Sequence, residues 1–581
     1  MRILGCSSFT TNTAAAILEN GVITTAIEND KIVGKRTRGL PEAAIRSCFE
    51  NTGTWWNELD AVAVATQPLR GWARKAQLRA RLSFRAPVAS AYYEANEIGS
   101  LARQLNDLRV LRKRAAGSAR VSTFNHHLCH AASSFYLSPF DRALILTADE
   151  HGDGISASLA IGEGNRIRVL RTIPYPHSIA WIYSQVTDLV GFLPHQEEHK
   201  TQWLSLEGEP SYKNVFMQML GGASGPVPRL DYSFFNPGLA THLTFSQKFY
   251  RQTGLPADSK EFSEEQRKAL ASSVQEACAE VLAGMIEHFR RSEGVKPVCL
   301  AGGLFQNALL VSFLEKNFDQ VFVPPTPANA GTALGAALLA WYGLTQSQRG
   351  DSFFDVFCGP RFTNQQIKEV LDNCKARYSL QNTQDRQLDI TVRLLGAGKI
   401  VGWFQNGCEF GPRALGARSV LASPWAPYVK ENLNDFIKHR EWFRPFAIAV
   451  PEEDSSQYFE ASAACRFMNS VATTRPEMKC LPESFLLPQN RVRLHVVAQA
   501  RNRLLWQLLR RFGEHAPAPM LLNTSFNLAG EPLVVTPRDA LRSYSCSGLD
   551  ALVIGNFVLC KSSLTTATRD VPVSESMSIG V

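Results

Sequence analysis

The chain has 581 residues, of which 45% are hydrophobic and 20% charged, and it carries a modest net charge of +8. One hydrophobic core rarely serves a chain of this length, so at least two domains are expected. A run of about 18 apolar residues does not occur, which argues against a membrane-spanning helix. The twelve cysteines are scattered without CxxC spacing, which argues against a zinc ribbon or a disulfide framework and favours a reducing cytoplasm.

The first elements predicted along the chain are strands. Residues 1–30 are predicted to form two short strands around a turn. The Glu-Asn-Gly sequence at 19–21 lies between apolar runs, which is a hairpin signal. The start lacks the basic and apolar segments of a signal peptide, so we interpret it as a first strand. Further strands are predicted over 59–66 and 143–154. A helix is predicted over 269–294, because apolar residues recur there at helical spacing up to a glycine.

Positive charge is concentrated between residues 70 and 120. This segment has twelve Lys and Arg residues against Glu94, Glu97 and Asp107, a surplus of nine. One interpretation is the solvated face of helices, and the other is a docking surface for an acidic or carrier-protein partner or a phosphorylated substrate. No DNA- or RNA-binding motif accompanies this charge, so nucleic acid is not an expected partner.

A histidine pair and a later acidic turn suggest a metal site. His126 and His130 are four residues apart, which places both imidazoles on one face of a helix. Asp149 and His151 end a predicted buried strand and could complete the coordination sphere. A carboxylate with imidazoles suits Fe, Mn or Zn. The alternative is a histidine-rich helix start whose rings are satisfied by hydrogen bonds.

Two glycine turns, at 301–307 and 329–335, each precede a predicted helix. Glycine lets main-chain N–H groups approach a phosphate, and a helix start favours negative charge. Either turn alone also fits close helix packing, but two in successive units favour a nucleotide. The residues assigned to nucleotide binding are Gly302, Gly303, Asn307, Gly331, Thr332 and Arg36.

A domain break is predicted near 343–360, where Gly, Ser, Gln and Pro interrupt the periodicity. Beyond it, arginines lie beside glycine turns, an arrangement that binds phosphates through paired hydrogen bonds. Several such arginines suggest more than one phosphate, or a phosphate and a carboxylate; the alternative is surface arginines paired with acids. The residues assigned to catalysis are Arg413, Arg418, Lys438, His439, Arg440, Arg444, Asn523, Ser525 and Asn527.

Motifs in both halves resemble the NodU/CmcH carbamoyltransferase family. The most specific are VGWFQNGCEFGPRALGARSVLASP, KHREWFRPFA and LLNTSFNLAGEPLVVTP in the C-terminal half, and NHHLCHAASSFYLSPF, LAGGLFQN and AGTALGAALLA in the N-terminal half. The resemblance spans nearly the whole chain. It implies an α/β protein with an actin-like ATPase fold over 1–345 and a YrdC-like α/β domain over 346–581.

The resemblance also implies an activity. The YrdC-like domain of the family condenses carbamoyl phosphate with ATP, which enters with Mg²⁺, to carbamoyl adenylate. The actin-like domain holds the adenylate beside a divalent metal and passes the carbamoyl group to a small-molecule alcohol, often in antibiotic biosynthesis. Arg413 and Arg418 would neutralise and position the two polyanions. Because carbamoyl phosphate decomposes in water, a closed path between the two sites is expected.

Several positions depart from the family pattern. The first turn has Thr11 and Asn12 where the family has His and Asp, and a threonine hydroxyl is a poor base compared with imidazole. Asn329 replaces an aspartate metal ligand, which removes a negative charge from that site. Trp203 stands where a glycine is usual and would fill space needed by a substrate or nucleotide. The segment LLPQNRVRLH also differs from the family's THVDGTARVQ.

Three interpretations follow. The first is a working carbamoyltransferase with an unusual acceptor, such as an amine that needs less help from a base. The second is adenylate chemistry with a different acyl group or a condensing step, and the third is a non-catalytic subunit that binds a nucleotide or a partner. Because metal-bound His130 and His151 cannot also take a proton, a nitrogen acceptor or a non-carbamoylating reaction is predicted over a simple hydroxyl.

Overall fold

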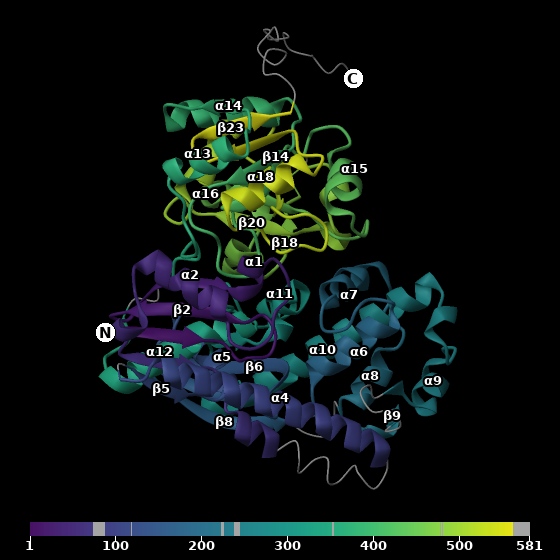
Figure 1. The fold of residues 1–581 in the computed structure, drawn as a ribbon. Helices are drawn as coiled ribbons and strands as arrows, with labels where there is room; N and C mark the ends of the chain where they lie inside the picture. The colour runs from purple at the N-terminus through teal and green to yellow at the C-terminus, as the bar shows by residue number, and fades with distance from the viewer. Residues whose placement is uncertain are drawn as a thin grey trace.

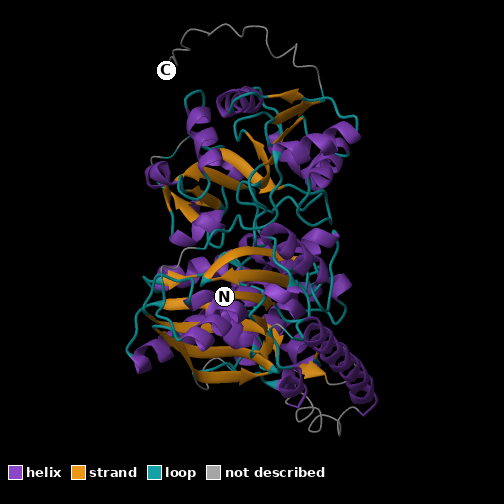
Figure 2. Cartoon of the chain, turned by 60° about the vertical axis from the view of Figure 1, so that its left-hand side comes forward, coloured by secondary structure: helices purple, strands orange, loops and turns teal. Residues whose placement is uncertain are grey.

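The computed structural model arranges the chain in two stacked parts (Figures 1 and 2). The N-terminal part ends with α12 (Thr332–Thr345), where the predicted break begins. The segment that follows α12 still contacts the N-terminal part: Thr25 Oγ1 donates a hydrogen bond to the carbonyl of Cys358. The structure describes residues 1–73, 87–117, 119–221, 226–236, 244–350, 354–476, 478 and 480–561.

The first sheet is built from the beginning of the chain, in the order β3-β2-β1-β4-β5. Strands β1 to β3 are antiparallel, and β4 and β5 run parallel to β1. The predicted turn is confirmed, since Asn20 and Gly21 both have positive φ. Residues 1–30 form three strands rather than two, because a second turn follows β1. The bounds are β1 Arg2–Cys6, β2 Ala14–Glu19, β3 Val22–Glu28, β4 Ala61–Val64 and β5 Arg120–Thr123.

The second sheet has the order β12-β11-β6-β7-β8. Read from the β8 edge, this is the same topology as that of the first sheet. Here β6 to β8 are antiparallel, and β11 and β12 run parallel to β6. Two sheets with the same strand order form the duplicated core of the actin-like fold, which confirms the fold expected for this part. The bounds are β6 Arg142–Gly152, β7 Ile155–Glu163, β8 Arg166–Pro174, β11 Val298–Ala301 and β12 Val321–Phe322.

Two helices fill the space between these sheets: α12 packs on the first sheet and α5 (His126–Phe135) on the second. The packing is close enough to require glycine. A Cβ atom at Gly335 would lie 1.9 Å from the carbonyl oxygen of Cys129. The predicted long helix is confirmed as α10. It spans Glu264–Glu293. Further α-helices among the described residues of this part are α1 Asn29–Val33, α2 Glu42–Thr52, α4 Pro87–Arg114, α6 Ile179–Leu189, α7 Glu198–Leu204, α8 Lys213–Met219, α9 Gln247–Thr253 and α11 Ala308–Asn317.

The C-terminal part is a mixed α/β unit around an eight-stranded sheet in the order β13-β23-β22-β14-β15-β21-β16-β20, which agrees with the YrdC-like domain expected there. Its strands are β13 Ser379–Leu380, β14 Val401–Phe404, β15 Arg418–Ala422, β16 Ala447–Pro451, β20 Leu494–Val497, β21 Leu521–Ser525, β22 Ala551–Ile554 and β23 Phe557–Cys560. Its helices are α13 Asn364–Asn373, α14 Gln384–Gly396, α15 Val429–Leu433, α16 Glu452–Tyr458, α17 Arg503–Gly513 and α18 Pro537–Ser545.

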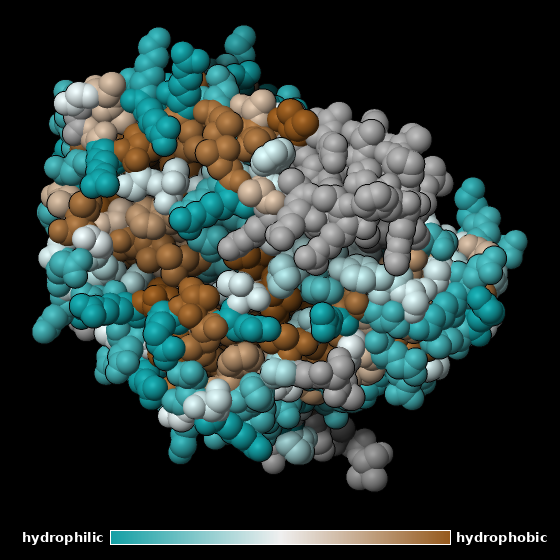
Figure 3. Space-filling view, turned by 90° about the horizontal axis from the view of Figure 1, so that it is seen from below, coloured by the Kyte–Doolittle hydropathy of each residue, from teal (hydrophilic) through white to brown (hydrophobic). Residues whose placement is uncertain are grey.

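The docking role predicted for the basic segment at 70–120 remains a prediction. Residues 74–86 of that segment lie outside the described residues. Seen from below, apolar side chains are interspersed with hydrophilic ones (Figure 3). Within the described ranges, no helix has both the length and the apolar character of a membrane span.

Candidate active site between the two parts

A cavity of about 490 Å³ lies where the two parts meet. The N-terminal part contributes the loop after β1, the end of β6, helices α6 and α7, and both glycine turns. The C-terminal part contributes the arginine-containing loops and β21. The closed path that the sequence predicts between two reaction centres remains a prediction. Among the residues that line the cavity are Thr11, Asn12, Asp149, Asn329, Arg413 and Ser525.

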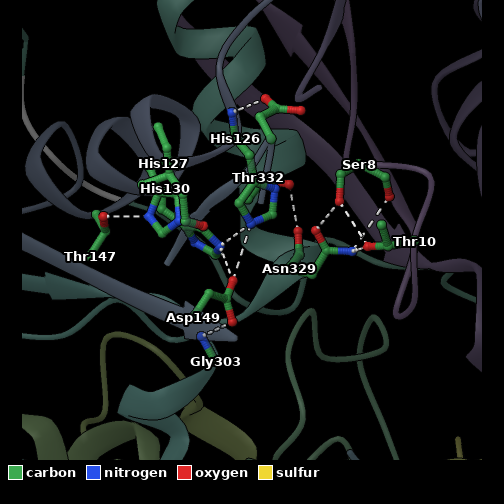
Figure 4. Close-up of polar contacts among 12 residues, drawn as sticks. Ser8, Thr10, His126, His127, His130, Thr147, Asp149, Gly303, Asn329 and Thr332 are labelled. Atoms are coloured by element: carbon green, nitrogen blue, oxygen red, sulfur yellow. Dashed lines mark hydrogen bonds and ion pairs between the residues drawn. The ribbon is translucent and has the colours of Figure 1, made fainter. Parts of the chain in front are cut away.

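Three predicted metal ligands converge beside this cavity (Figure 4): Asp149 lines it, His126 lines a second, smaller cavity, and His130 is buried. His126 and His130 lie on one face of α5, as predicted, and Asp149 lies near the C-terminal end of β6. Asp149 Oδ2 lies 3.1 Å from His126 Nε2 and 2.9 Å from His130 Nε2. The ligand atoms of the three residues all lie within 4.8 Å of one another, close enough to share one ion.

The electrostatics of these three residues suit a cation. Burial alone would raise the pKa of Asp149, but its hydrogen bonds with His126 and His130 outweigh burial and hold that pKa well below its usual range. Burial lowers the pKa of His130, which keeps its imidazole neutral and able to ligate. A carboxylate and two imidazole nitrogens therefore fit a divalent metal ion.

Asn329 lies beside the three ligands but faces the first turn of the chain. Its Oδ1 accepts a hydrogen bond of 2.6 Å from Ser8 Oγ, and its Nδ2 donates to the carbonyl of Thr11. The amide therefore binds the loop after β1. His151, the further ligand suggested by the sequence, is not among the three convergent residues; it lines a second, smaller cavity and packs edge-on against Tyr175.

The predicted nucleotide-binding residues divide into two groups. Gly303 and Asn307 line the cavity, and Gly303 N donates a hydrogen bond of 2.9 Å to Asp149 Oδ1. The cavity lining does not include the other residues of the set. Gly302 and Gly331 allow close main-chain approaches, Thr332 Oγ1 donates to the carbonyl of Asn329, and Arg36 is exposed. A direct nucleotide contact therefore remains a prediction for the first group alone.

The opposite wall of the cavity is strongly cationic. Arg413, Arg440, Arg444 and Arg493 all line it. Burial and the neighbouring Arg444 lower the pKa of Arg413 to about 10 and that of Arg440 to about 9. Within the described chain, Arg413 Nε, Arg440 Nη2 and Arg493 Nε are buried and find no hydrogen-bond acceptor. Desolvated cations with unused donors indicate an anion-binding wall.

The sequence did not single out Arg493. Arg493 lies just before β20, in the segment LLPQNRVRLH. Because this segment departs from the family pattern, the resemblance assigned no role to Arg493. Burial and then Arg413, Arg440 and Arg444 hold its pKa well below the usual range.

Arg418 does not take the place that the sequence predicts. Its side chain is fully buried, and its guanidinium donates hydrogen bonds to the carbonyls of Gln405, Asn406, Ala417 and Pro360. Its Cζ lies 3.6 Å from the ring centre of Phe404. Arg418 therefore holds the loop that carries Arg413, and only Arg413 of the pair reaches the cavity.

Of the other predicted catalytic residues, some line the cavity and others do not. Asn523 and Ser525 line the cavity from β21. Lys438 is buried behind them, where Nζ donates 2.7 Å to Asn527 Oδ1 and also bonds to the carbonyl of Ser525. His439 is exposed and lies outside the cavity lining.

Trp203 does not fill the cavity, contrary to expectation. It is 3% exposed and packs with Ala308, Leu309, Val471 and Leu487. Arg493 Cζ lies 5.7 Å from its ring centre. Trp203 therefore belongs to the apolar contact between the two parts.

The chain belongs to the carbamoyltransferase family. Residues 2–338 match the family description "Carbamoyltransferase N-terminus" and residues 392–561 match "Carbamoyltransferase C-terminus". The family resemblance read from the motifs is thereby confirmed.

Relatives share most of the chain. Nodulation protein NolNO of Sinorhizobium fredii is 30% identical over 96% of this chain and 80% of its own length. Nodulation protein NolO of Bradyrhizobium diazoefficiens is 32% identical over 75% of this chain and 79% of its own length. Among solved structures, HypF of T. kodakarensis aligns at 14% identity and a TM-score of 0.32, over 59% of this chain and 48% of that one. An alignment with so low a score carries no weight for this chain.

Proposed function

We propose that this protein condenses carbamoyl phosphate with ATP to carbamoyl adenylate and transfers the carbamoyl group to a small-molecule acceptor. The observation that carries the proposal is a cavity with a cationic wall next to a cluster of metal-ligand residues. The cationic wall suits phosphate groups, and the cluster, which reaches the cavity through Asp149, suits a metal ion. Family membership supports the transfer of a carbamoyl group.

Each wall would contribute differently. Arg413, Arg440, Arg444 and Arg493 would bind the phosphates of ATP and carbamoyl phosphate and hold them in reacting geometry, while Ser525 supplies a hydroxyl. His126, His130 and Asp149 would hold a divalent cation, which supplies positive charge near the oxygens of the adenylate. Residues of both parts line the cavity, and exclusion of water from it would limit hydrolysis of the activated carbamoyl group. The nodulation relatives make a natural-product acceptor our choice of substrate class.

The proposal is tested by pyrophosphate release. Purified protein mixed with ATP, Mg²⁺ and carbamoyl phosphate should release pyrophosphate, and omission of carbamoyl phosphate should abolish the release. No release with both substrates present would contradict the proposal and favour a non-catalytic binding subunit. The mass of the product then distinguishes a carbamoyl group from another acyl group.

A further inference from the structure

The proposed transfer needs a proton acceptor that the first turn of the chain does not supply. Thr11 lines the cavity where the family resemblance implies a histidine, and a hydroxyl is a poor base near neutral pH. The histidines that the sequence offered as substitutes do not serve. His130 Nε2 is committed to Asp149, and His151 faces the second cavity.

His195 lies in the same cavity as Thr11, in the loop between α6 and α7. Its Nδ1 forms an ion-paired contact of 2.8 Å with Glu150 Oε2, and Glu150 also lines the cavity. A carboxylate on Nδ1 fixes the imidazole tautomer, so that Nε2 carries the lone pair that accepts a proton. The hydrogen bond with Glu150 also raises the pKa of His195.

The backbone around His195 is held in a strained shape. Its φ is 62°, in the left-handed region that non-glycine residues rarely adopt. The His195 N–H donates to Glu198 Oε1 and, at 3.3 Å, to Ser184 Oγ, which ties the loop to α7 and α6. Strain that neighbouring groups maintain is typical of functional positions.

We propose that His195, positioned by Glu150, is the general base of the acceptor step; this rests on the proposed function. The acceptor X–H attacks the carbamoyl carbon of the adenylate, the C–X bond forms, and the bond from that carbon to the phosphate oxygen breaks. AMP leaves with the bond electrons, and the acceptor proton passes to His195 Nε2 and then to solvent. A base at this position allows a hydroxyl to serve as the acceptor group, so an amine is not required.

The test separates adenylate formation from transfer, with water as the acceptor in both variant and wild type. Asparagine tolerates a positive φ, so His195→Asn should keep the loop intact. We expect pyrophosphate release in the first turnover to be unchanged, while steady-state AMP formation falls on the order of a hundredfold or more. Glu150→Gln keeps an acceptor oxygen without the charge and should show a smaller loss. Exposed His288→Asn, on α10, is the matched control.

Chemical rescue distinguishes a base from a merely structural residue. His195→Gly should regain part of its AMP formation when imidazole is added, in proportion to the free imidazole base. Equal AMP formation by wild type and His195→Asn, or a loss that imidazole does not restore, would overturn the inference. A wild type that releases no pyrophosphate contradicts the proposed function instead, so the two failures are distinguishable.

Discussion

Arg413 Nη2 donates a hydrogen bond of 3.1 Å to the main-chain carbonyl of Gln306. Arg413 comes from the C-terminal part and Gln306 from the loop after β11 in the N-terminal part. The bond places a desolvated guanidinium at the boundary that the activated carbamoyl group would cross. Arg413 would thus have two roles: it would bind phosphate, and its hydrogen bond would link the two parts.

Replacing Arg413 with Ala should lower pyrophosphate release on the order of a hundredfold or more, because a positioned charge is lost from the anion-binding wall. The protein should remain folded, since the substitution removes one hydrogen bond, to the carbonyl of Gln306, and at the same time relieves a desolvated positive charge. Pyrophosphate release under single-turnover conditions measures the effect, with exposed Arg386→Ala on α14 as the control. Wild-type rates in the Arg413 variant would remove it from the proposed site.

Replacing Arg418 with Ala should mainly destabilise the fold. The buried carbonyls of Gln405, Asn406 and Ala417 would lose their donor, at a cost of about 3 kcal/mol or more in the free energy of unfolding. Denaturant unfolding followed by fluorescence measures that loss. A fully stable variant with no pyrophosphate release would instead return Arg418 to direct phosphate binding.

Asn329→Asp should increase metal occupancy. One carboxylate oxygen can keep the hydrogen bond from Ser8. The other would face the Thr11 carbonyl that Asn329 Nδ2 now donates to, and this repulsion favours turning the carboxylate toward the metal ligands, where it adds a charged ligand. Elemental analysis after purification in metal-supplemented buffer should show sub-stoichiometric metal in the wild type and more in the variant. Full occupancy in both proteins would mean that Asn329 is not the missing ligand.

Trp203→Ala should weaken the contact between the two parts. Loss of a buried tryptophan costs about 3 kcal/mol or more, and Arg493 would also lose the ring beneath it. The largely exposed Trp55 provides the comparison, because Trp55→Ala should change stability by about 0.5 kcal/mol or less. If the two variants unfolded at the same denaturant concentration, the packing role of Trp203 would be disproved.

Acid should destabilise the fold through His495. Burial lowers the pKa of His495 to about 3, whereas an unfolded histidine titrates near 6.5. As the pH falls below about 6.5 the unfolded chain takes up a proton that the folded chain refuses, so stability is lost down to about pH 3. At pH 5 the loss is about 2 kcal/mol.

His495→Gln should remove that part of the pH dependence. Glutamine can still accept a hydrogen bond from Asn523 Nδ2, which lies 3.0 Å from His495 Nδ1. Unfolding free energies compared at pH 5 and pH 7.5 measure the difference. An unchanged pH dependence in the variant would show that His495 is not protonated differently in the two states.

Features that depend on neighbours along the chain were predictable. The Asn20-Gly21 turn needs positive φ at both residues, and the helical spacing of His126 and His130 places them on one face whatever surrounds them. The strand that carries Asp149 near its C-terminal end was visible as an apolar run followed by acids. The family motifs also allowed two α/β parts to be predicted. The residues of these motifs are set by local turns and by the ligands that the turns would hold.

Only the tertiary structure decided which charged groups share a space. Arg413 and Arg418 lie in one glycine-rich motif, yet one faces the cavity and the other is enclosed by carbonyls, because Arg418 begins a buried strand and Arg413 precedes it in a loop. Arg493 and His195 belong to no motif and reach the cavity through packing between distant segments. Sequence determines local conformation through short-range sterics and hydrogen bonding, whereas burial and charge pairing depend on residues that folding brings together.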